Sequence, residues 1–261
     1  MAKKKLTSYE RVRLARSKDR PSVMDYIHEL FDDFVELKGD RLFRDDKSIV
    51  GGIAMFHGIP VTVIGHRKGK TTEENITYNF GMTSPEGYRK ASRLMRQAEK
   101  FSRPVITLID TPGAYPGIDA ESNGQSNAIA ESIALMSSLK VPTIAIITGE
   151  GSSGGALALA TADRVWMLEN AVYSILSPEG FATILWKDAK RAPQASDVMK
   201  ITSEELKEMG LIDEVIPENK KMFETMDRML LRELKELGKI KSGSLVTMRY
   251  KKYRMIDGGA H

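Results

Sequence analysis

The chain has 261 residues, of which 41% are hydrophobic and 28% are charged, and its formal net charge is +4. This composition is typical of a soluble globular protein and allows one large domain or two small ones. The sequence contains no cysteine, which excludes disulfide bonds, thiolate zinc ligands and a cysteine nucleophile in this chain. No apolar run approaches the roughly 20 residues that a transmembrane helix needs.

Basic residues gather at the two ends of the chain, in residues 1–20 and in the tail 241–261. The basic start is not followed by an apolar segment, so it lacks the pattern of a secretory signal, and we expect a cytoplasmic protein. We expect flexible ends around one domain over residues 21–240, with docking of the ends on an acidic partner or a phosphate-bearing ligand as the alternative. Neither end carries a nucleic-acid-binding motif, so nucleic acid is not expected as the main partner, nor is a membrane.

The first element after the basic start is a predicted helix over residues 21–39. Ser22 can cap its first turn, apolar residues recur at helical spacing, and Gly39 can end it. A predicted β-hairpin follows, in which two apolar strands are joined by a turn at His57–Gly58. These strands cover residues 48–56 and 59–66.

Beyond the hairpin, helices alternate with nearly continuous apolar strands. The predicted strands cover residues 104–110, 141–147, 164–169 and 211–217. The predicted helices cover residues 84–101, 125–140, 153–162, 202–210 and 220–238. Repeated strand–helix–strand units are typical of an α/β domain with a largely parallel sheet.

The segment Thr148–Ala160, with the sequence TGEGSSGGALALA, matches two well-known patterns. Gly149, Gly151 and Gly154 spell the G-x-G-x-x-G dinucleotide fingerprint, and Glu169 ends the next strand where an acid would meet a ribose. The helix after these glycines is short for a crossover, however, and a second glycine-rich turn precedes the segment. A dinucleotide-binding oxidoreductase therefore stays an alternative, as do glycines that serve only tight packing.

The same segment also spells G-x-S-x-G, the nucleophile elbow of serine hydrolases, at Gly151, Ser153 and Gly155. A serine nucleophile needs a base, which is usually histidine, and in α/β-hydrolases that histidine follows the serine. Only His261, at the end of the tail, follows Ser153. We therefore do not expect Ser153 to act as a nucleophile.

The loop GHRKGKTT looks like a phosphate-binding loop, but only three residues separate Gly65 from Gly69, where that loop requires four. Its basic side chains are Arg67, Lys68 and Lys70. They are expected either to be solvated or to attract a phosphate group without the specific loop geometry.

Two predicted strands end in turns that are rich in small residues, TPGAYPG after residues 104–110 and GEGSSGGA after residues 141–147. Ligands of α/β sheets gather at the carboxyl ends of the strands, so one backbone amide from each turn can converge on a single oxygen. Such a pair stabilises an oxyanion, and the helix that begins near Gly155 adds a dipole that favours negative charge. The pair suits a thioester enolate and requires no serine, histidine or cysteine.

Several long motifs resemble the carboxyltransferase α subunits of bacterial acetyl-CoA carboxylases, and the likeness spans roughly residues 22–237. These motifs cover residues 65–101, 108–117, 149–160, 170–188 and 200–218. The resemblance implies the crotonase (ClpP/crotonase-like) fold, a spiral of ββα units, here with helices at both ends.

The resemblance further implies one half of a biotin-dependent enzyme. Such enzymes transfer a carboxyl group from carboxybiotin, on a carrier protein, to acetyl-CoA, and they form malonyl-CoA for fatty acid biosynthesis. The implied partners are a β subunit with a four-cysteine zinc ribbon, in an α2β2 assembly, the biotin carboxyl carrier protein and biotin carboxylase. Biotin itself is then the base, so few histidines are needed. No metal is expected in this chain.

By motif position, the resemblance places Gly155 and Ala156 at the biotin ureido oxygen, with Gly113 and Ala114 on the facing side. Further residues expected to bind substrate, or to shape the wall near biotin or the subunit contact, are Tyr115, Gly154, Ser177, Glu179, Gly180 and Phe181. Phe181 stands where relatives are expected to have a smaller residue, so this wall is expected to be tighter here.

Simpler interpretations remain open for two of the residues near these turns. Tyr115 can be a packing aromatic residue, and Glu150 can be a solvated acid in a loop. A self-contained crotonase-fold CoA enzyme is the other alternative for the whole chain.

Overall fold

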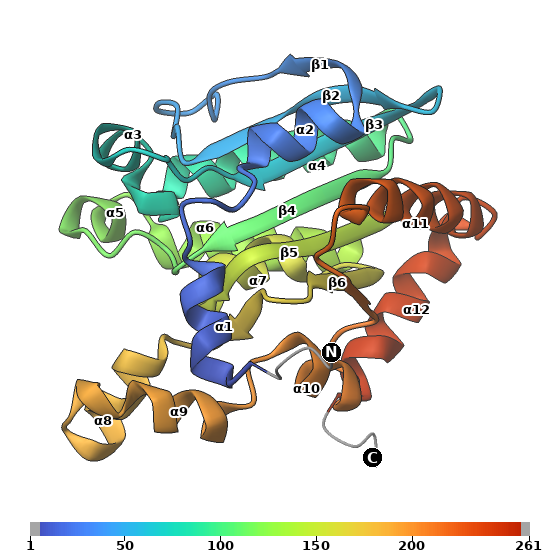
Figure 1. Cartoon of the computed structure of the whole chain (residues 1–261). Coiled ribbons are helices and arrows are strands. Elements are labelled where there is room, and N and C mark those ends of the chain that lie inside the picture. The colour runs from blue at the N-terminus through green and yellow to red at the C-terminus, as the bar shows by residue number, and fades with distance from the viewer. Residues whose placement is uncertain (1–5, 257–261) are drawn as a thin grey trace.

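The structure is a computed structural model of the whole chain, and it describes residues 6–256. One sheet is sandwiched between two helical layers (Figure 1). Its strands are β1 (Asp32–Glu36), β2 (Ile49–Phe56), β3 (Ile59–His66), β4 (Val105–Thr111), β5 (Thr143–Ser152), β6 (Arg164–Leu168), β7 (Val172–Ser174) and β8 (Glu214–Ile216).

The larger helices form the two layers that cover the sheet and also occur near both ends of the described chain. They are α1 (Ser8–Ala15), α2 (Val23–Leu30), α4 (Pro85–Lys100), α6 (Gln125–Ser138), α7 (Ser153–Ala160), α8 (Pro178–Trp186), α9 (Ala192–Met199), α11 (Met222–Leu237) and α12 (Ser242–Arg254). The short ones are α3 (Thr72–Thr77), η1 (Asn79–Gly81), α5 (Ile118–Ser122), η2 (Ala189–Arg191) and α10 (Ser203–Glu208).

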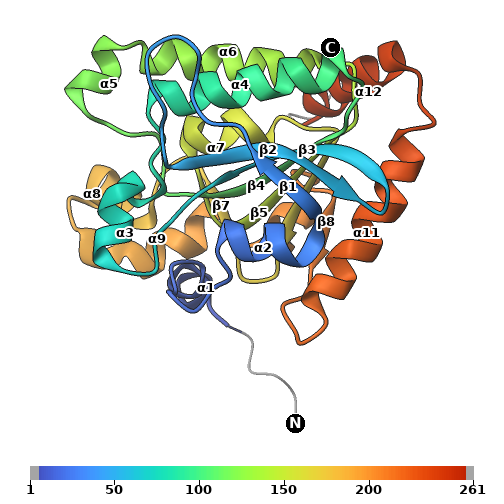
Figure 2. The ribbon, with the colours of Figure 1, turned by 90° about the horizontal axis from the view of Figure 1, so that it is seen from above.

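The strands follow the order β1-β2-β3-β4-β5-β6-β8, and β7 pairs with the carboxyl end of β5. The pairs β1–β2 and β2–β3 are antiparallel, whereas β3, β4, β5, β6 and β8 run parallel. Figure 2 shows α4, α6 and α7 on one face of the sheet and α2 and α11 on the other. Because both faces are covered, the central strands are apolar almost throughout, as the sequence predicts.

The predicted hairpin and the predicted helix that follows it are confirmed. His57 and Gly58 both have positive φ angles, 47° and 77°, which is the geometry of the tight turn that suits a twisted hairpin. Pro85 occupies the first turn of α4, where its missing N–H costs nothing. Thr202 and Glu205 form the capping box of α10.

The helix predicted over residues 21–39 is only half correct, because α2 ends at Leu30 and the chain continues as the edge strand β1. Asp33 has a left-handed φ of 51° at the bulge where β1 joins β2. Phe31 meanwhile packs its buried ring against Phe56.

The two chain ends differ from the flexible arms that the sequence predicts, although the division at residues 20 and 240 itself stays a prediction. Residues 8–15 and 242–254 form α1 and α12. Val12 of α1 and Leu245 and Arg249 of α12 are fully or almost fully buried, so these helices pack on the domain. Residues 1–5 and 257–261 of the predicted arms lie outside the described residues.

Candidate functional site

The two glycine-rich turns lie side by side at the carboxyl ends of β4 and β5. These strands are parallel neighbours, and the end of β4 pairs with β5 at Thr111 and Gly151. A Cβ atom on Gly155 would lie 2.8 Å from the amide nitrogen of Ala114 and 2.9 Å from the carbonyl carbon of Gly113. Only a residue without a side chain allows the turns to approach this closely. The two turns therefore lie close together, while the convergence of their amides on one oxygen stays a prediction.

The turn after β4 is held in place by local hydrogen bonds. Thr111 Oγ1 accepts a hydrogen bond from the Gly113 amide (3.1 Å) and donates one to the Gly113 carbonyl (2.8 Å). The Tyr115 amide donates to the Thr83 carbonyl (3.0 Å), and Gln125 Nε2 donates to the carbonyls of both Thr83 and Tyr115 at 2.9 Å. These bonds fix the backbone of Gly113 and Ala114 before any ligand arrives.

The structure does not support a dinucleotide loop. Strand β5 continues to Ser152, so Gly149 and Gly151 lie within a strand rather than in a phosphate-binding loop. A Cβ atom on Gly149 would lie 2.4 Å from Asp110 Oδ1, which explains this glycine by packing. The Glu169 carboxylate already accepts a hydrogen bond from the Glu218 amide (3.0 Å).

The elbow geometry is present without the chemistry of a serine hydrolase. Ser153 is exposed and has a left-handed φ of 57° at the junction of β5 and α7. Within residues 6–256, however, no histidine hydrogen-bonds to Ser153. His66 is fully buried, and His57 pairs with Asp227 at 2.7 Å. His261 lies outside the described residues.

A chain of charged side chains crosses the carboxyl ends of three neighbouring strands. Lys68, just after β3, donates to Asp110 Oδ1 of β4 (2.6 Å) and to Glu150 Oε2 of β5 (3.1 Å). The Glu150 amide donates to the same Asp110 oxygen (2.9 Å), and Nε of Arg16, which follows α1, donates to Glu150 Oε1 (2.7 Å). Burial opposes the charge of Lys68, but the two carboxylates outweigh it and raise the pKa of Lys68.

Glu150 is therefore a buried member of an ion network rather than a solvated acid. The sequence did not identify this network, because its members come from four elements far apart in the chain. The available signal was that Asp110 and Glu150 each stand at the end of a buried strand, where α/β sheets gather ligands.

The residues predicted to form a wall lie on α8, a separate element. Ser177 caps α8 by accepting a hydrogen bond from the Gly180 amide (3.1 Å). Phe181 is half-buried, and its ring stands edge-on to Trp186 at a centroid distance of 6.1 Å. Arg16 connects α8 to the glycine-rich end of β5, because its guanidinium group binds both oxygens of Glu179 at 2.9 and 3.2 Å.

Tyr115 is half-buried and packs locally. A Cβ atom on Gly117 would lie 2.4 Å from Tyr115 Cε1, so the ring folds over its own turn. This contact agrees with the interpretation of Tyr115 as a packing aromatic residue, while its predicted contact with substrate stays a prediction.

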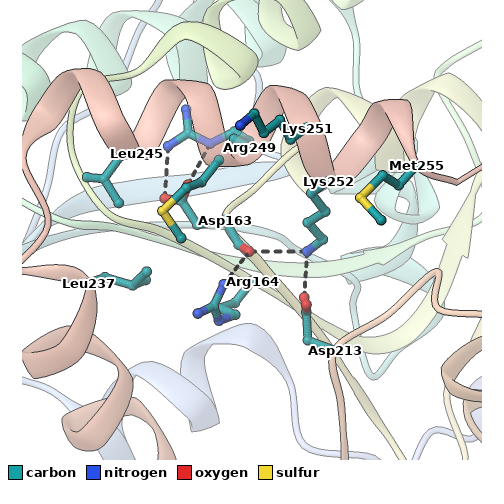
Figure 3. Close-up of a pocket in the computed structure, with 10 residues that line it drawn as sticks. Asp163, Arg164, Asp213, Leu237, Leu245, Arg249, Lys251, Lys252 and Met255 are labelled. Atoms are coloured by element: carbon teal, nitrogen blue, oxygen red, sulfur yellow. Dashed lines mark hydrogen bonds and ion pairs between the residues drawn. The ribbon is translucent and has the colours of Figure 1, made fainter. Parts of the chain in front are cut away.

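A cavity of about 350 Å³ lies at the opposite end of the sheet, where α12 crosses the starts of β6 and β8 (Figure 3). Four of its charged groups are already paired: Arg249 with Asp163, and Lys252 Nζ with Asp213 Oδ2 at 2.5 Å. A smaller cavity of about 180 Å³ lies beside Lys68 and Asp110, at the end of the sheet where the glycine turns meet. We place the candidate site at that end, because the glycine-rich turns with Gly113 and Gly155 lie there.

Within residues 6–256, no group of three histidine, aspartate or glutamate side chains is placed to hold a metal ion. None of the helices in that range is both long and apolar enough to cross a bilayer.

The fold is that of crotonase-type carboxyltransferases. The chain is similar to transcarboxylase 12S, with a TM-score of 0.72 and 19% identity over 87% of this chain and 44% of that one. It is also similar to the β subunit of geranyl-CoA carboxylase from P. aeruginosa, with a TM-score of 0.70 and 15% identity over 91% of this chain and 46% of that one. The predicted α/β crotonase fold is thereby confirmed.

Residues 2–257 match the sequence model of a family described as acetyl co-enzyme A carboxylase carboxyltransferase-like, and the chain belongs to this family. It is 53% identical to the carboxyl transferase subunit alpha of acetyl-coenzyme A carboxylase from Halalkalibacterium halodurans, over 98% of this chain and 81% of that protein. It is 55% identical to the carboxyl transferase subunits beta/alpha of acetyl-coenzyme A carboxylase from Natranaerobius thermophilus, over 97% of this chain. The chain spans 43% of the length of that second protein.

Proposed function

We propose that the chain is the α subunit of an acetyl-CoA carboxylase carboxyltransferase. It transfers the carboxyl group of carboxybiotin, on a carrier protein, to acetyl-CoA and forms malonyl-CoA, in the first committed step of fatty acid biosynthesis. The family supports this proposal, and one observation carries the site: Gly155 lies so close to the backbone of Gly113 and Ala114 that a Cβ atom on it would clash with both.

The residues at this contact fit a ligand that brings negative charge. Gly113 has a φ of 142°, which strongly favours glycine, and no atom lies within 4 Å of the position that its Cβ would take. The open space at the turn therefore borders bare backbone. Gly155 lies in the first turn of α7, where amides lack intrahelical partners and the helix dipole is positive.

We assign the donation of hydrogen bonds to the amides of Gly155 and Ala114, one from each turn. The resemblance matches both Gly155 and Ala156 to the ureido oxygen. Ala156 is the fourth residue of α7, so its amide is the first that can donate to a carbonyl within the helix, and it is the weaker candidate of the two. Carboxybiotin supplies the carboxyl group and, through its ureido nitrogen, the base. The two amides would stabilise an oxyanion, and each donor of this kind is typically worth about 2.7–4 kcal/mol of barrier.

The proposed partners are a zinc-ribbon β subunit, the biotin carboxyl carrier protein and biotin carboxylase, in the cytoplasm. Support for the β partner comes from the Natranaerobius thermophilus relative, whose name joins the beta and alpha subunits. An α2β2 assembly follows from the family resemblance. The wall on α8, with Ser177, Glu179, Gly180 and Phe181, would then face biotin or the subunit contact.

A reconstitution experiment tests this function. The chain is purified alone and together with a carboxyltransferase β subunit, and malonyl-CoA-dependent carboxylation of biocytin is measured. We expect activity only from the pair. Carboxyl transfer or crotonyl-CoA hydration by the isolated chain would contradict the subunit proposal, as would tight binding of NAD, and inactivity of the pair would contradict the reaction.

A further inference from the structure

Helix α1 lies at the carboxyl end of β5, between the sheet and the pair α8–α9 (Figure 1). Its N-cap Thr7 and the side chain of Glu10 form a capping box, which secures the first turn. Val12 and Ala15 pack against Val172 at the start of β7 and against Ile201. The helix is thus a fixed part of the domain, and its charged side chains have defined positions.

Arg16, which follows α1, connects two parts of the candidate site. Its Nε donates to Glu150 Oε1 at 2.7 Å, and its two terminal nitrogens bind Glu179 at 2.9 and 3.2 Å. Burial opposes the charge of Arg16, but the bonds to Glu179 and Glu150 outweigh it and raise the pKa of the guanidinium group. The fork geometry allows one side chain to hold both carboxylates in fixed directions.

On the sheet side, Glu150 is rigidly placed. Lys68 Nζ donates to Oε2 of Glu150 at 3.1 Å, and the amide of Glu150 donates to Asp110 Oδ1 at 2.9 Å. Glu150 also precedes the first turn of α7 by only a few residues. The sheet end of the Arg16 bridge is therefore fixed relative to Gly155.

On the other side, Glu179 stands in the first turn of α8, directly before Gly180 and Phe181. Tyr9 of α1 places its hydroxyl group 3.5 Å from the same carboxylate. Two side chains later in α8 point outward, since Ile184 and Leu185 are 67% and 56% exposed. The start of α8 is thus tied to the domain through α1.

We propose that Arg16 is a positioning residue, which sets the distance between the α8 wall and the glycine turns by bridging Glu179 and Glu150. The bridge is a property of this chain alone, whereas its effect on the reaction rests on the proposed function. If α8 borders biotin, loss of the bridge weakens binding on the biotin side of the site. We expect malonyl-CoA binding to change less, because these contacts of Arg16 reach only Glu150 of β5 and Glu179 of α8.

The kinetic test uses the complex of this chain with a β subunit. Arg16→Ala is compared with Arg13→Ala, a matched control that removes the same charge from an exposed position on α1. We expect Arg16→Ala to raise the KM for biocytin about tenfold and to leave the KM for malonyl-CoA within twofold, while Arg13→Ala changes neither. An equal change in both KM values, or no change, would overturn the positioning role.

A second measurement tests the bridge without any activity. Hydrogen exchange of the α8 amides is followed in the same variants and in Arg16→Ala/Glu179→Gln. Faster exchange in α8 with Arg16→Ala, unchanged exchange with Arg13→Ala, and no further increase in the double variant are expected, because both changes remove one interaction. Unaltered exchange in α8 with Arg16→Ala would contradict the bridge itself. If Arg16→Ala speeds exchange in α8 but the wild-type complex is inactive, the bridge stands and only the proposed function is refuted.

Discussion

Arg249 and Asp163 form a fully buried ion pair that fixes α12 to the domain. The guanidinium group binds both carboxylate oxygens, at 2.9 and 2.8 Å, and the two side chains are 0% and 4% exposed. Arg249 also donates to the carbonyls of Met136 (2.8 Å) and Leu139 (2.9 Å) at the end of α6, where the helix dipole favours a cation. The basic tail thus contributes a structural residue.

Removal of this arginine should strongly destabilise the protein. Arg249→Met leaves Asp163 buried without its partner, and we expect a loss of about 3–5 kcal/mol in the free energy of unfolding, measured with urea. Arg254→Met, at an exposed position of α12, is the control and should have little effect. A loss below about 1 kcal/mol for Arg249→Met would contradict the structural role.

A methyl group on Gly155 should separate the two glycine turns. It would lie 2.8 Å from the Ala114 nitrogen, so the backbone must move, and a displacement of this kind can reduce a rate by about 100-fold. We therefore expect Gly155→Ala to reduce kcat of the reconstituted complex to that extent while the subunits still assemble. Gly243→Ala, where nothing lies within 4 Å of the new atom, is the matched control. A kcat within twofold of wild type would show that the amide pair is misplaced.

A methyl group on Gly149 should break the ion network at the strand ends. It would lie 2.4 Å from Asp110 Oδ1 and push that carboxylate away from Lys68, so we expect a loss of about 1–3 kcal/mol in stability. In an Asp110→Ala background the space is free, and the same substitution should then cost almost nothing. Equal costs in the two backgrounds, measured by urea unfolding, would show that Asp110 is not the reason for the glycine.

His66 should make the folded state sensitive to acid. Burial, with a smaller contribution from the charge of Lys68, lowers the pKa of His66 from 6.5 to about 3. Between these values the unfolded chain binds a proton that the folded chain does not, so stability falls as the pH drops below about 6.5. The slope for one proton is about 1.4 kcal/mol per pH unit. The contribution of His66 to stability is thus greatest above pH 6.5.

The variant His66→Leu should lose this component. Its free energy of unfolding, measured from pH 7 to pH 5, should decline less steeply than that of the wild type by about the slope of one proton. His28→Leu, at an exposed position of α2, is the control. Parallel pH profiles for His66→Leu and wild type would mean that the buried histidine accepts its proton in the folded state.

Elements with local signals were predictable from the sequence. The turn at His57–Gly58, Pro85 at the start of α4 and the apolar run of β5 each reflect chemistry within a few residues. Strand β1 was not predictable in this way, because residues 32–36 continue an apolar helical pattern. Their pairing with β2 overrides that pattern.

The candidate site divides in the same manner. The convergence of Gly113 and Gly155 follows from parallel neighbouring strands, so the sequence could indicate it. The bonds of Arg16 to Glu150 and Glu179 join residues separated by 134 and 163 positions, and no periodicity or motif encodes such pairs. The sequence therefore indicates a solvated arm at the basic start, whereas in the structure Arg16 bridges β5 and α8.

Helix α1 has a consequence for the order of folding during synthesis. Arg16 and Arg20 find their partners in Glu179 and Glu218, and Arg20 lies 198 residues before Glu218. At typical elongation rates of about 5–20 residues per second, the first helix leaves the ribosome roughly 10–40 seconds before its last partner. Until then Arg20 has no native carboxylate to bind, whereas Glu150 and Glu179 become available to Arg16 earlier. This early segment is thus among the last parts of the described chain to complete its native contacts.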